Sequence, residues 1–309
     1  MERYYSFAEY CRKTFHKKLY RAALDAGMTC PNRDGTKGTR GCIFCSVAGS
    51  GDFAVRFDGE KLEREDLIYN HQDAEEGSFI AYFQSFTNTY APAEKLYRLY
   101  AAALNNPLFA GISIATRPDC VSGDVITVLK RLREEYPDKF IWVELGLQSI
   151  HETSASWMRR GYQTEEYDQA ARALHETGTD VITHIIIGLP GEGKEEILET
   201  VRHVNTIGTD GIKIHLLHYL EDSDLGQEYL KDPDKYHMLE EEEYIDIVCE
   251  CIASLDPDTV IHRLTGDGNG ETLIGPHWSR DKRHVLNRIR HTLKEKNITQ
   301  GCRAIYENQ

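Results

Sequence analysis

The sequence predicts an α/β fold, a partial (β/α)6 TIM-like barrel with a C-terminal extension. Two observations predict this fold. Apolar runs rich in β-branched and aromatic residues recur about thirty residues apart, which is the length of one strand–helix repeat. The runs are continuously apolar rather than alternating, as in parallel strands that are covered on both faces. Such a βα alternation favours an open or partial barrel over an antiparallel sandwich.

Each expected element can be located along the chain. The first strand runs from about Leu19 to Leu24 and leads into a cysteine-containing loop. Thr164 can cap a helix that stops at Gly178, and residues 194–207 form another helix that stops at Gly208. The later strands begin near Phe79, Ile112, Ile141, Val181 and Ile212.

Two regions are expected. Residues 1–220 form the barrel core, with the cysteine loop at 30–45, and residues 221–309 form an extension packed on the barrel. The extension is expected to contain an acidic helix around 240–255, a glycine-rich stretch and a basic helix. The length of 309 residues and the hydrophobic share of 40% are ordinary for a folded protein.

Charge and hydropathy exclude several classes of protein. The net charge of −14 argues against a surface coated for non-specific nucleic-acid binding. Basic runs occur at residues 12–21 and 280–296, which suit either a local grip on a polyanion or two solvated helix faces. The longest uncharged stretch, 99–116, is interrupted by Asn-Asn-Pro and does not predict a membrane span. The N-terminal residues lack the apolar core of a secretory signal, so we expect a cytoplasmic protein with reduced thiols.

Three cysteines have the spacing of a metal centre. Eleven residues separate Cys30 from Cys42, and two separate Cys42 from Cys45. The two-residue gap lets both thiolates reach one centre, and glycines in the loop let Cys30 fold alongside them. The centre could be zinc, with Cys11 or His16 as the fourth ligand, or a cube of four irons with one iron left open. The remaining cysteines are expected to be inert: Cys120, Cys249, Cys251 and Cys302.

The cysteine loop resembles that of the radical S-adenosylmethionine (radical SAM) superfamily, in which an aromatic residue, here Phe44, precedes the last cysteine. The eleven-residue spacing is similar to that of the Elongator catalytic-subunit-like branch. Several motifs resemble, in the same order, those of small bacterial proteins of the YhcC/YtqA type, and they extend over nearly the whole chain. These motifs are C-P-N-R-D-G, F-Q-S-F-T-N-T-Y, E-L-G-L-Q-S, G-L-P-G-E and H-R-L-T-G-D.

The resemblance implies the cofactors and their ligands. Cys30, Cys42 and Cys45 would bind a 4Fe-4S cluster whose open iron holds S-adenosylmethionine (SAM). An electron from a donor such as flavodoxin or ferredoxin would then release a 5′-deoxyadenosyl radical that abstracts hydrogen from the substrate. The implied SAM-binding residues lie at strand ends: Gln84, Ser85, Thr87, Gln148, Arg160, His184 and Gly188.

Each of these candidates also has a plainer interpretation. Gln84, Ser85 and Thr87 suit ordinary turn chemistry, and Gln148 suits a helix cap. Arg159 competes with Arg160 for the SAM carboxylate. His184 stands where coproporphyrinogen-type relatives carry an aspartate that holds the ribose, and it suits a hydrogen-bonded residue of the inner face equally well. Gly188 suits a common βα turn.

Further candidates lie on the substrate side. By two-residue alternation Lys213 and His215 share one face of the sixth strand, and His218 is expected on the other. Residues 262–268 are expected to form a compact polar turn that either caps the barrel mouth or lies on the surface.

The leading functional hypothesis is a radical SAM enzyme that acts on tRNA. The resemblance points to the wobble uridine and to conversion of a 5-carboxymethylaminomethyl group to 5-aminomethyl. Two alternatives remain: a radical SAM enzyme of a small metabolite, and a non-catalytic binding protein stapled by zinc. The sequence holds no G-x-x-x-x-G-K-S/T motif, which excludes a P-loop nucleotide hydrolase. About ninety residues follow the barrel, too few for an acetyltransferase domain.

Overall fold

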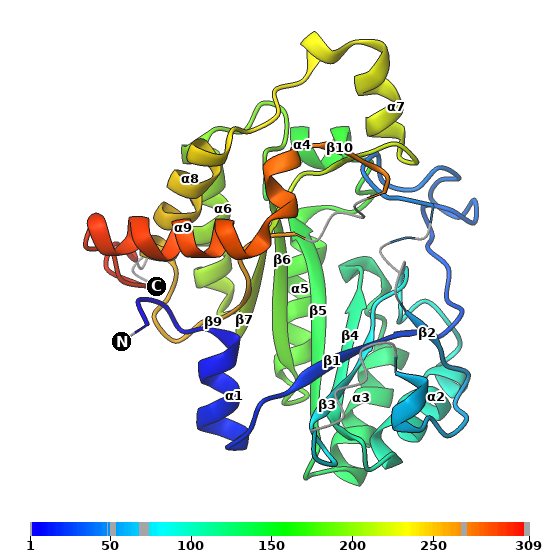
Figure 1. Ribbon diagram of the computed structural model, residues 1–309. Coiled ribbons are helices and arrows are strands. Elements are labelled where there is room, and N and C mark those ends of the chain that lie inside the picture. Colours follow the sequence, from blue (N-terminus) through cyan, green and yellow to red (C-terminus); the bar gives the residue numbers. More distant parts are fainter. Residues whose placement is uncertain (1, 48, 50–53, 68–73, 267–270, 306–309) are drawn as a thin grey trace.

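The computed structural model describes residues 2–47, 49, 54–67, 74–266 and 271–305. Its centre is an eight-stranded sheet in the order β2-β1-β3-β4-β5-β6-β7-β9 (Figure 1). Every neighbouring pair in this sheet is parallel. The order is linear, so the described strands form an open, partial barrel, which confirms the predicted fold class.

The six predicted strands form the middle of the sheet and follow one another in chain order. This order is what successive strand–helix units produce, because each helix returns the chain to the same edge. The strands are β1 (Tyr20–Asp25), β3 (Phe79–Phe83), β4 (Phe109–Thr116), β5 (Phe140–Gln148), β6 (Asp180–Ile187) and β7 (Gly211–Leu216).

Two strands at the sheet edges differ from expectation. The two-residue β2 (Val55–Arg56) pairs with β1, and β9 (Val260–Arg263) pairs with β7. The prediction that residues 262–268 form a polar turn is therefore wrong at its start, because His262 and Arg263 belong to β9. Only Val260 and Ile261 of β9 are apolar, too few for a recognisable run. Asp267 and Gly268 lie outside the described residues.

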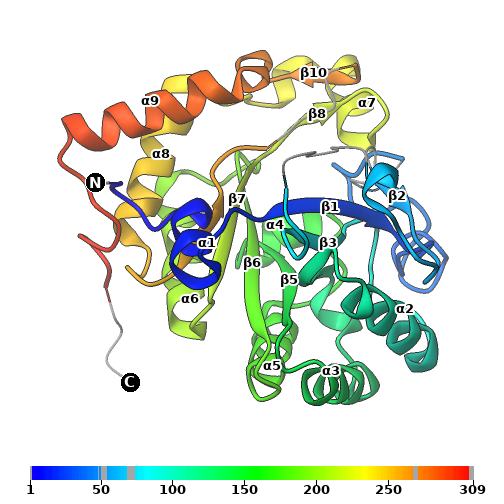
Figure 2. The same ribbon diagram turned by 60° about the horizontal axis from the view of Figure 1, so that its bottom comes forward.

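Helices cover the outer face of the sheet (Figure 2). After β3, β4, β5 and β6 come α2 (Ala93–Asn105), α3 (Gly123–Glu135), α5 (Thr164–His175) and α6 (Lys194–Ile207), and the short α4 (Glu152–Trp157) precedes α5. Thr164 does not cap α5 as predicted. Gln163 is the N-cap, its amide donates to the Glu166 carboxylate at 2.7 Å, and the Thr164 hydroxyl donates to the Ile150 carbonyl instead.

The extension contains the two predicted helices. The acidic α8 (Glu241–Ser254) packs against the basic α9 (Lys282–Glu295), and ion pairs such as Arg288 with Glu242 join them. The remaining elements are α1 (Phe7–Phe15), β8 (Tyr219–Leu220), α7 (Asp224–Lys231), β10 (Leu273–Gly275) and the 3-10 turns η1 (Arg64–Asp66), η2 (Pro118–Cys120), η3 (Pro233–Lys235) and η4 (His277–Arg280). No helix among the described residues is long and apolar enough to span a membrane.

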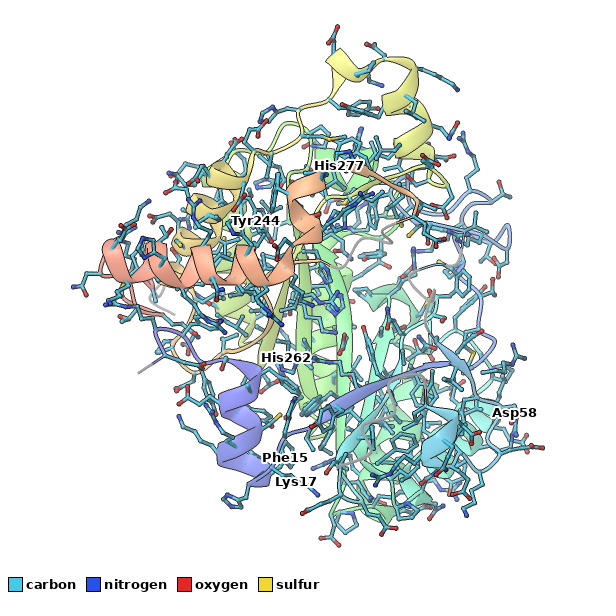
Figure 3. All side chains as sticks on the ribbon, viewed as in Figure 1. Phe15, Lys17, Asp58, Tyr244, His262 and His277 are labelled. Atoms are coloured by element: carbon cyan, nitrogen blue, oxygen red, sulfur yellow. The ribbon has the colours of Figure 1, made fainter. Side chains whose placement is uncertain are left out.

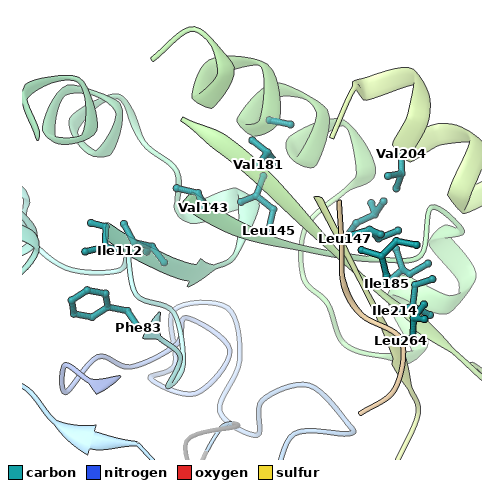
Figure 4. Packing of buried hydrophobic residues seen from close by; sticks show 14 of the residues in the cluster. Phe83, Ile112, Val143, Leu145, Leu147, Val181, Ile185, Val204, Ile214 and Leu264 are labelled. Carbon is teal, nitrogen blue, oxygen red and sulfur yellow. The ribbon is translucent and has the colours of Figure 1, made fainter. Parts of the chain in front are cut away.

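The main core lies between the sheet and its outer helices (Figure 4). On β5, Val143, Leu145 and Leu147 face this core, and Ile185 of β6 and Ile214 of β7 do the same. Each such side chain contributes about 1.5–3 kcal/mol of transfer free energy by its burial. Residues between these positions must face the barrel interior, because side chains alternate along a strand.

Candidate functional site

The loop that follows β1 lies at the carboxyl edge of the sheet (Figure 1). This loop carries the three cysteines, and all three are half-buried. Two backbone hydrogen bonds turn the loop tightly around the thiols. The Arg33 amide donates to the Cys30 carbonyl at 2.8 Å, and the Cys45 amide donates to the Cys42 carbonyl at 3.0 Å. The sequence folds this way because the carboxyl end of a parallel strand opens into a loop, where barrel sites are built.

The loop is fastened to the rest of the chain between its last two cysteines. The Ile43 amide donates to the Met158 carbonyl at 3.1 Å, and the Leu225 amide donates to the Ile43 carbonyl at 2.8 Å. Asp224, at the start of α7, forms ion pairs with Arg159 and with Arg40 of the loop, and the distance to Arg40 is 2.8 Å. An apolar cluster of Ile43, Met158, Leu189, Leu217, Tyr219 and Leu225 surrounds this junction.

The thiols of Cys42 and Cys45 interact directly. The hydrogen bond from Cys45, with the charges of Arg117 and Arg33, outweighs burial and lowers the pKa of Cys42 to about 7. The same bond, and then burial, raises the pKa of Cys45 well above its ordinary value. Asn32 donates to the Cys42 sulfur at 3.6 Å. Cys42 is therefore the first of this pair to become a thiolate.

The donor set fits a cluster better than a single ion. Within the part of the chain that the structure describes, no three Cys, His, Asp or Glu side chains converge closely enough to hold one metal ion. Cys11 is buried in an apolar cluster with Trp142, and His16 ends α1, at the opposite edge of the sheet from the loop. Three thiols without a fourth ligand suit a cube of four irons, because each thiolate binds a different iron.

Thiol chemistry can test this arrangement in metal-free protein. At about pH 7 we expect iodoacetamide to alkylate Cys42 faster than Cys45, because the thiolate is the nucleophile. Lowering the pH by one unit should slow Cys42 about fivefold, since the pH then falls below a pKa of about 7. Peptide mass mapping over time measures both rates. Equal rates at Cys42 and Cys45 would contradict the assigned pair.

The turn after β3 lies beside the cysteine loop. The Gln84 amide donates to the Leu24 carbonyl, and the Thr87 amide donates to the Thr29 carbonyl, both at 3.2 Å. Ser85 and Thr87 are buried. Sequence reasoning missed Asn88, whose side-chain amide donates to the carbonyls of Phe83 and Ala115 at 3.0 and 2.9 Å and holds the ends of β3 and β4 together.

The turn after β5 is organised by Arg160. Gln148 ends β5 in the left-handed region, at a φ of 68°. The Arg160 side chain is buried, and its N–H groups meet five acceptors: the carbonyls of Leu147, Ser149 and Tyr162, the Glu152 carboxylate and the Thr164 hydroxyl. In this structure Arg160 therefore shapes the turn and directs no spare donor into the barrel. Its neighbour Arg159 pairs with Asp224 and Glu228.

The end of β6 carries the next two candidates. Both ring nitrogens of His184 are engaged, Nε2 with Glu144 at 2.8 Å and Nδ1 with His215 at 3.3 Å, which leaves neither for a ribose hydroxyl. Gly188 has a φ of +96°, and a Cβ there would lie 3.2 Å from Leu239. Its lack of a side chain therefore serves a close approach between β6 and the segment before α8.

A buried polar layer crosses the barrel interior. Glu144 of β5 accepts from Ser113 at 2.7 Å and forms an ion pair with Lys213 of β7, whose ammonium also donates to Tyr82 at 3.2 Å. Nearby, Arg21 of β1 contacts His262 of β9 at 3.0 Å. Sequence reasoning selected Lys213 and missed Glu144, Tyr82 and Arg21. A lone carboxylate in the apolar run of β5 is the signal that could have found Glu144.

The charges of this layer are coupled. Burial alone would raise the pKa of Glu144, but the Lys213 ammonium and the His184 hydrogen bond outweigh it and hold the pKa well below the usual range. Burial lowers the pKa of Lys213 to about 7, although Glu144 opposes that shift. Burial also lowers the pKa of His184 and of His215, so both rings are neutral near pH 7.

His215 shares the inner face with Lys213, as predicted, but His218 does not continue the alternation. Strand β7 ends at Leu216, and His218 Nε2 contacts the Ser279 hydroxyl of η4 at 3.2 Å. The alternation rule fails there because it holds only within a strand.

The model of the Radical SAM superfamily matches residues 34–204, and that of the Radical_SAM C-terminal domain matches residues 209–295. YtqA of Bacillus subtilis, an uncharacterized protein, is 40% identical over 302 residues, 97% of this chain and 92% of that protein.

Two other proteins are more distant relatives: one is similar in its fold, and the other is similar over a short stretch of sequence. The archaeal Elp3 of Methanocaldococcus infernus, solved without its N-terminus, aligns with a TM-score of 0.65 at 17% identity, covering 92% of this chain and 65% of that chain. The tRNA-2-methylthio-N(6)-dimethylallyladenosine synthase of Shewanella baltica is 32% identical over 79 residues, 25% of this chain and 17% of that protein. The archaeal Elp3 has the same fold as this chain. The likeness to the synthase applies only to the 79 residues that it covers.

Proposed function

The chain belongs to the radical SAM superfamily, and on that premise we propose that it modifies the wobble uridine of tRNA by converting a 5-carboxymethylaminomethyl side chain to 5-aminomethyl. Enzymes of this superfamily use a 4Fe-4S cluster and SAM and need an electron donor. Cys30, Cys42 and Cys45 would hold the cluster, and together with SAM it would supply a 5′-deoxyadenosyl radical able to abstract hydrogen from the substrate.

The observation that carries the radical chemistry is the three-thiol loop. Cys30, Cys42 and Cys45 lie on one loop at the carboxyl edge of a parallel barrel, where they would hold the cluster. The inner polar layer lies beneath this loop, inside the barrel, where a reacting group would be shielded from water. The apolar cluster around Ile43 keeps the loop fixed above it.

Support for a tRNA substrate is of a different kind. The eleven-residue cysteine spacing resembles the Elongator-like branch, and the fold resembles that of an archaeal Elp3. The wobble position and the carboxymethyl unit, with hydrogen abstracted next to it, come from the resemblance to the YhcC/YtqA type.

The structure separates the two basic runs that would grip an anticodon stem. Lys17 and Lys18 lie between α1 and β1, at the amino edge of the sheet. Helix α9 instead begins after β10 and η4, and β10 pairs with β8 just beyond the carboxyl end of β7. Figure 3 places Lys17 and His277 of η4 at opposite ends of the molecule. The run on α9 is thus the one near the barrel mouth.

Charge reversal tests this placement. We expect Arg283→Glu with Arg288→Glu to weaken tRNA binding about tenfold, because each removes an attraction to phosphate that salt also screens. A second variant reverses three charges of the other basic run, Lys13→Glu, Lys17→Glu and Lys18→Glu. It should weaken tRNA binding much less. Filter binding at several salt concentrations measures both sets. If neither set changes the affinity, the nucleic-acid interpretation fails.

The reaction itself is tested by anaerobic incubation. Reconstituted protein with SAM, a reductant and bulk tRNA should deplete 5-carboxymethylaminomethyluridine and accumulate 5-aminomethyluridine, measured by mass spectrometry of nucleosides. SAM cleavage without any change in tRNA nucleosides would favour a small-metabolite substrate. A protein that binds one zinc and leaves SAM intact would favour the non-catalytic alternative.

A further inference from the structure

We propose that His215 presents its Nδ1 nitrogen as a fixed hydrogen-bond acceptor to an N–H or O–H group of the substrate, with its orientation set by a chain through His184 to Glu144. His184, Glu144 and Lys213 are positioning residues in this chain. The inference rests on the proposed function for the identity of the donor, the amine of the 5-carboxymethylaminomethyl side chain.

The chain is continuous and crosses three strands. Glu144 of β5 contacts Nε2 of His184 of β6 at 2.8 Å, and Nδ1 of His184 contacts Nε2 of His215 of β7 at 3.3 Å. The far end is anchored by the ion pair of Glu144 with Lys213 and by the Ser113 hydroxyl at 2.7 Å. These contacts hold both imidazole rings in one orientation.

The polarity of the chain follows from its anchor. An ionised carboxylate only accepts hydrogen bonds, so Nε2 of His184 carries the proton. Nδ1 of neutral His184 is then an acceptor, and the proton of the second bond must sit on Nε2 of His215. Nδ1 of neutral His215 is left with a free lone pair. The assignment of both tautomers is therefore forced by Glu144, provided that both rings stay neutral.

The surrounding charges keep both rings neutral. Lys213 of β7 and Arg263 of β9 place positive charge near the two histidines, which disfavours a second proton on either ring. Among the described residues, Glu144 is the acidic group whose charge acts against this effect. Burial acts in the same direction and is the largest influence on the pKa of each ring. Neither histidine therefore gains the second proton that would reverse the polarity.

The acceptor belongs to the residue of this chain that lies nearest the mouth of the barrel. His184 lies level with Lys213 in the strand register, and His215 lies level with Ile186, one inward-facing position nearer the carboxyl edge. Exposure rises along the same path: the side chain of Glu144 is 0% exposed and that of His184 is 16% exposed. His215 is half-buried, and its Nδ1 forms no hydrogen bond with another described residue.

This arrangement selects one kind of substrate group. A lone pair on a neutral ring attracts an amine, ammonium or hydroxyl hydrogen and repels a carboxylate oxygen. In the proposed substrate, the amine of the side chain would meet His215, and the carboxylate would have to lie elsewhere. His215 would thereby orient the methylene group between amine and carboxylate, from which hydrogen is abstracted.

Nitrogen NMR tests the acceptor without any turnover. In reconstituted protein labelled with 15N-histidine, we expect His215 to show a protonated Nε2 and an unprotonated Nδ1 between about pH 6.5 and about pH 8. Its signals among those of the thirteen histidines are assigned by their loss in His215→Asn. A proton on Nδ1, or a charged ring, in this range would overturn the proposal.

Kinetics test the role in substrate binding. His215→Leu should lower kcat/KM for tRNA about tenfold, the effect of one lost hydrogen bond, whereas His215→Asn keeps an acceptor near the Nδ1 position and should recover most of it. His203→Leu, a variant of a histidine on the outer helix α6 that pairs with Asp168 of α5, is the matched control and should match the wild type. Wild-type turnover in His215→Leu, or no recovery in His215→Asn, would overturn the proposal. If the wild type does not convert tRNA, the wobble assignment fails, while the NMR measurement still decides whether His215 offers an acceptor.

Discussion

Alanine at any one of Cys30, Cys42 and Cys45 is expected to abolish both iron binding and cleavage of SAM. Each thiolate would bind a different iron of the cube, so losing one would leave that iron without its protein ligand. We expect less than about one thousandth of the wild-type rate of 5′-deoxyadenosine formation, because the chemistry belongs to the cofactor.

Iron content after anaerobic reconstitution and 5′-deoxyadenosine by chromatography are the two measurements. Cys302→Ala is the matched control, because this exposed thiol lies outside the loop, and it should keep full iron content and full activity. Circular dichroism should show an intact fold in every variant. An alanine variant of the loop that retained iron and still cleaved SAM would refute the assignment of the site.

Lys213→Met is expected to lower the free energy of unfolding by about 3–5 kcal/mol, because it leaves the Glu144 carboxylate buried without its counter-charge. The double variant Glu144→Gln with Lys213→Met removes both charges and should recover much of that loss. Urea denaturation followed by circular dichroism measures all three proteins. Equal stability of Lys213→Met and the wild type would show that the ion pair is not formed in solution.

The same pair predicts how stability depends on pH. Lys213 has a pKa of about 7 in the fold and an ordinary value of 10.5, so the unfolded chain binds more protons between these values and stability should rise with pH across that window. The depressed pKa of Glu144 contributes stability that is present above its ordinary value of 4.5 and is lost as the pH falls through the folded value. Lys213→Met should show no such rise on the alkaline side.

The fold was largely predictable because its strands are long, apolar and regularly spaced. Most of the six central strands are largely buried, as in β3, where every residue from Phe79 to Phe83 is buried, and composition reveals such runs. The edge strands were not predictable. In β9 the backbone pairs with β7, but His262 and Arg263 give the segment the composition of a loop, and only tertiary pairing makes it a strand.

The site was predictable where chemistry demands a spacing and unpredictable where it depends on partners across the barrel. The gap between Cys42 and Cys45 is a local property that the sequence shows directly. The roles of Arg160 and His184 depend on which atoms other strands bring to them, and those atoms saturate both side chains. Lys213 was identifiable as unusual, but its partner Glu144 lies 69 residues earlier in the chain, and no local pattern relates the two.

The fastening of the cysteine loop to α7 has a consequence for exchanging parts between relatives. Asp224 and Leu225 come after the last barrel strand, yet they hold Arg40, Arg159 and the Ile43 carbonyl. A chimera that took all residues after the last barrel strand from another member of the family would also replace the brace of its own cysteine loop. Grafts are therefore expected to fold well only when the crossover lies beyond residue 226, so that the C-terminal segment can differ while the brace is inherited with the barrel.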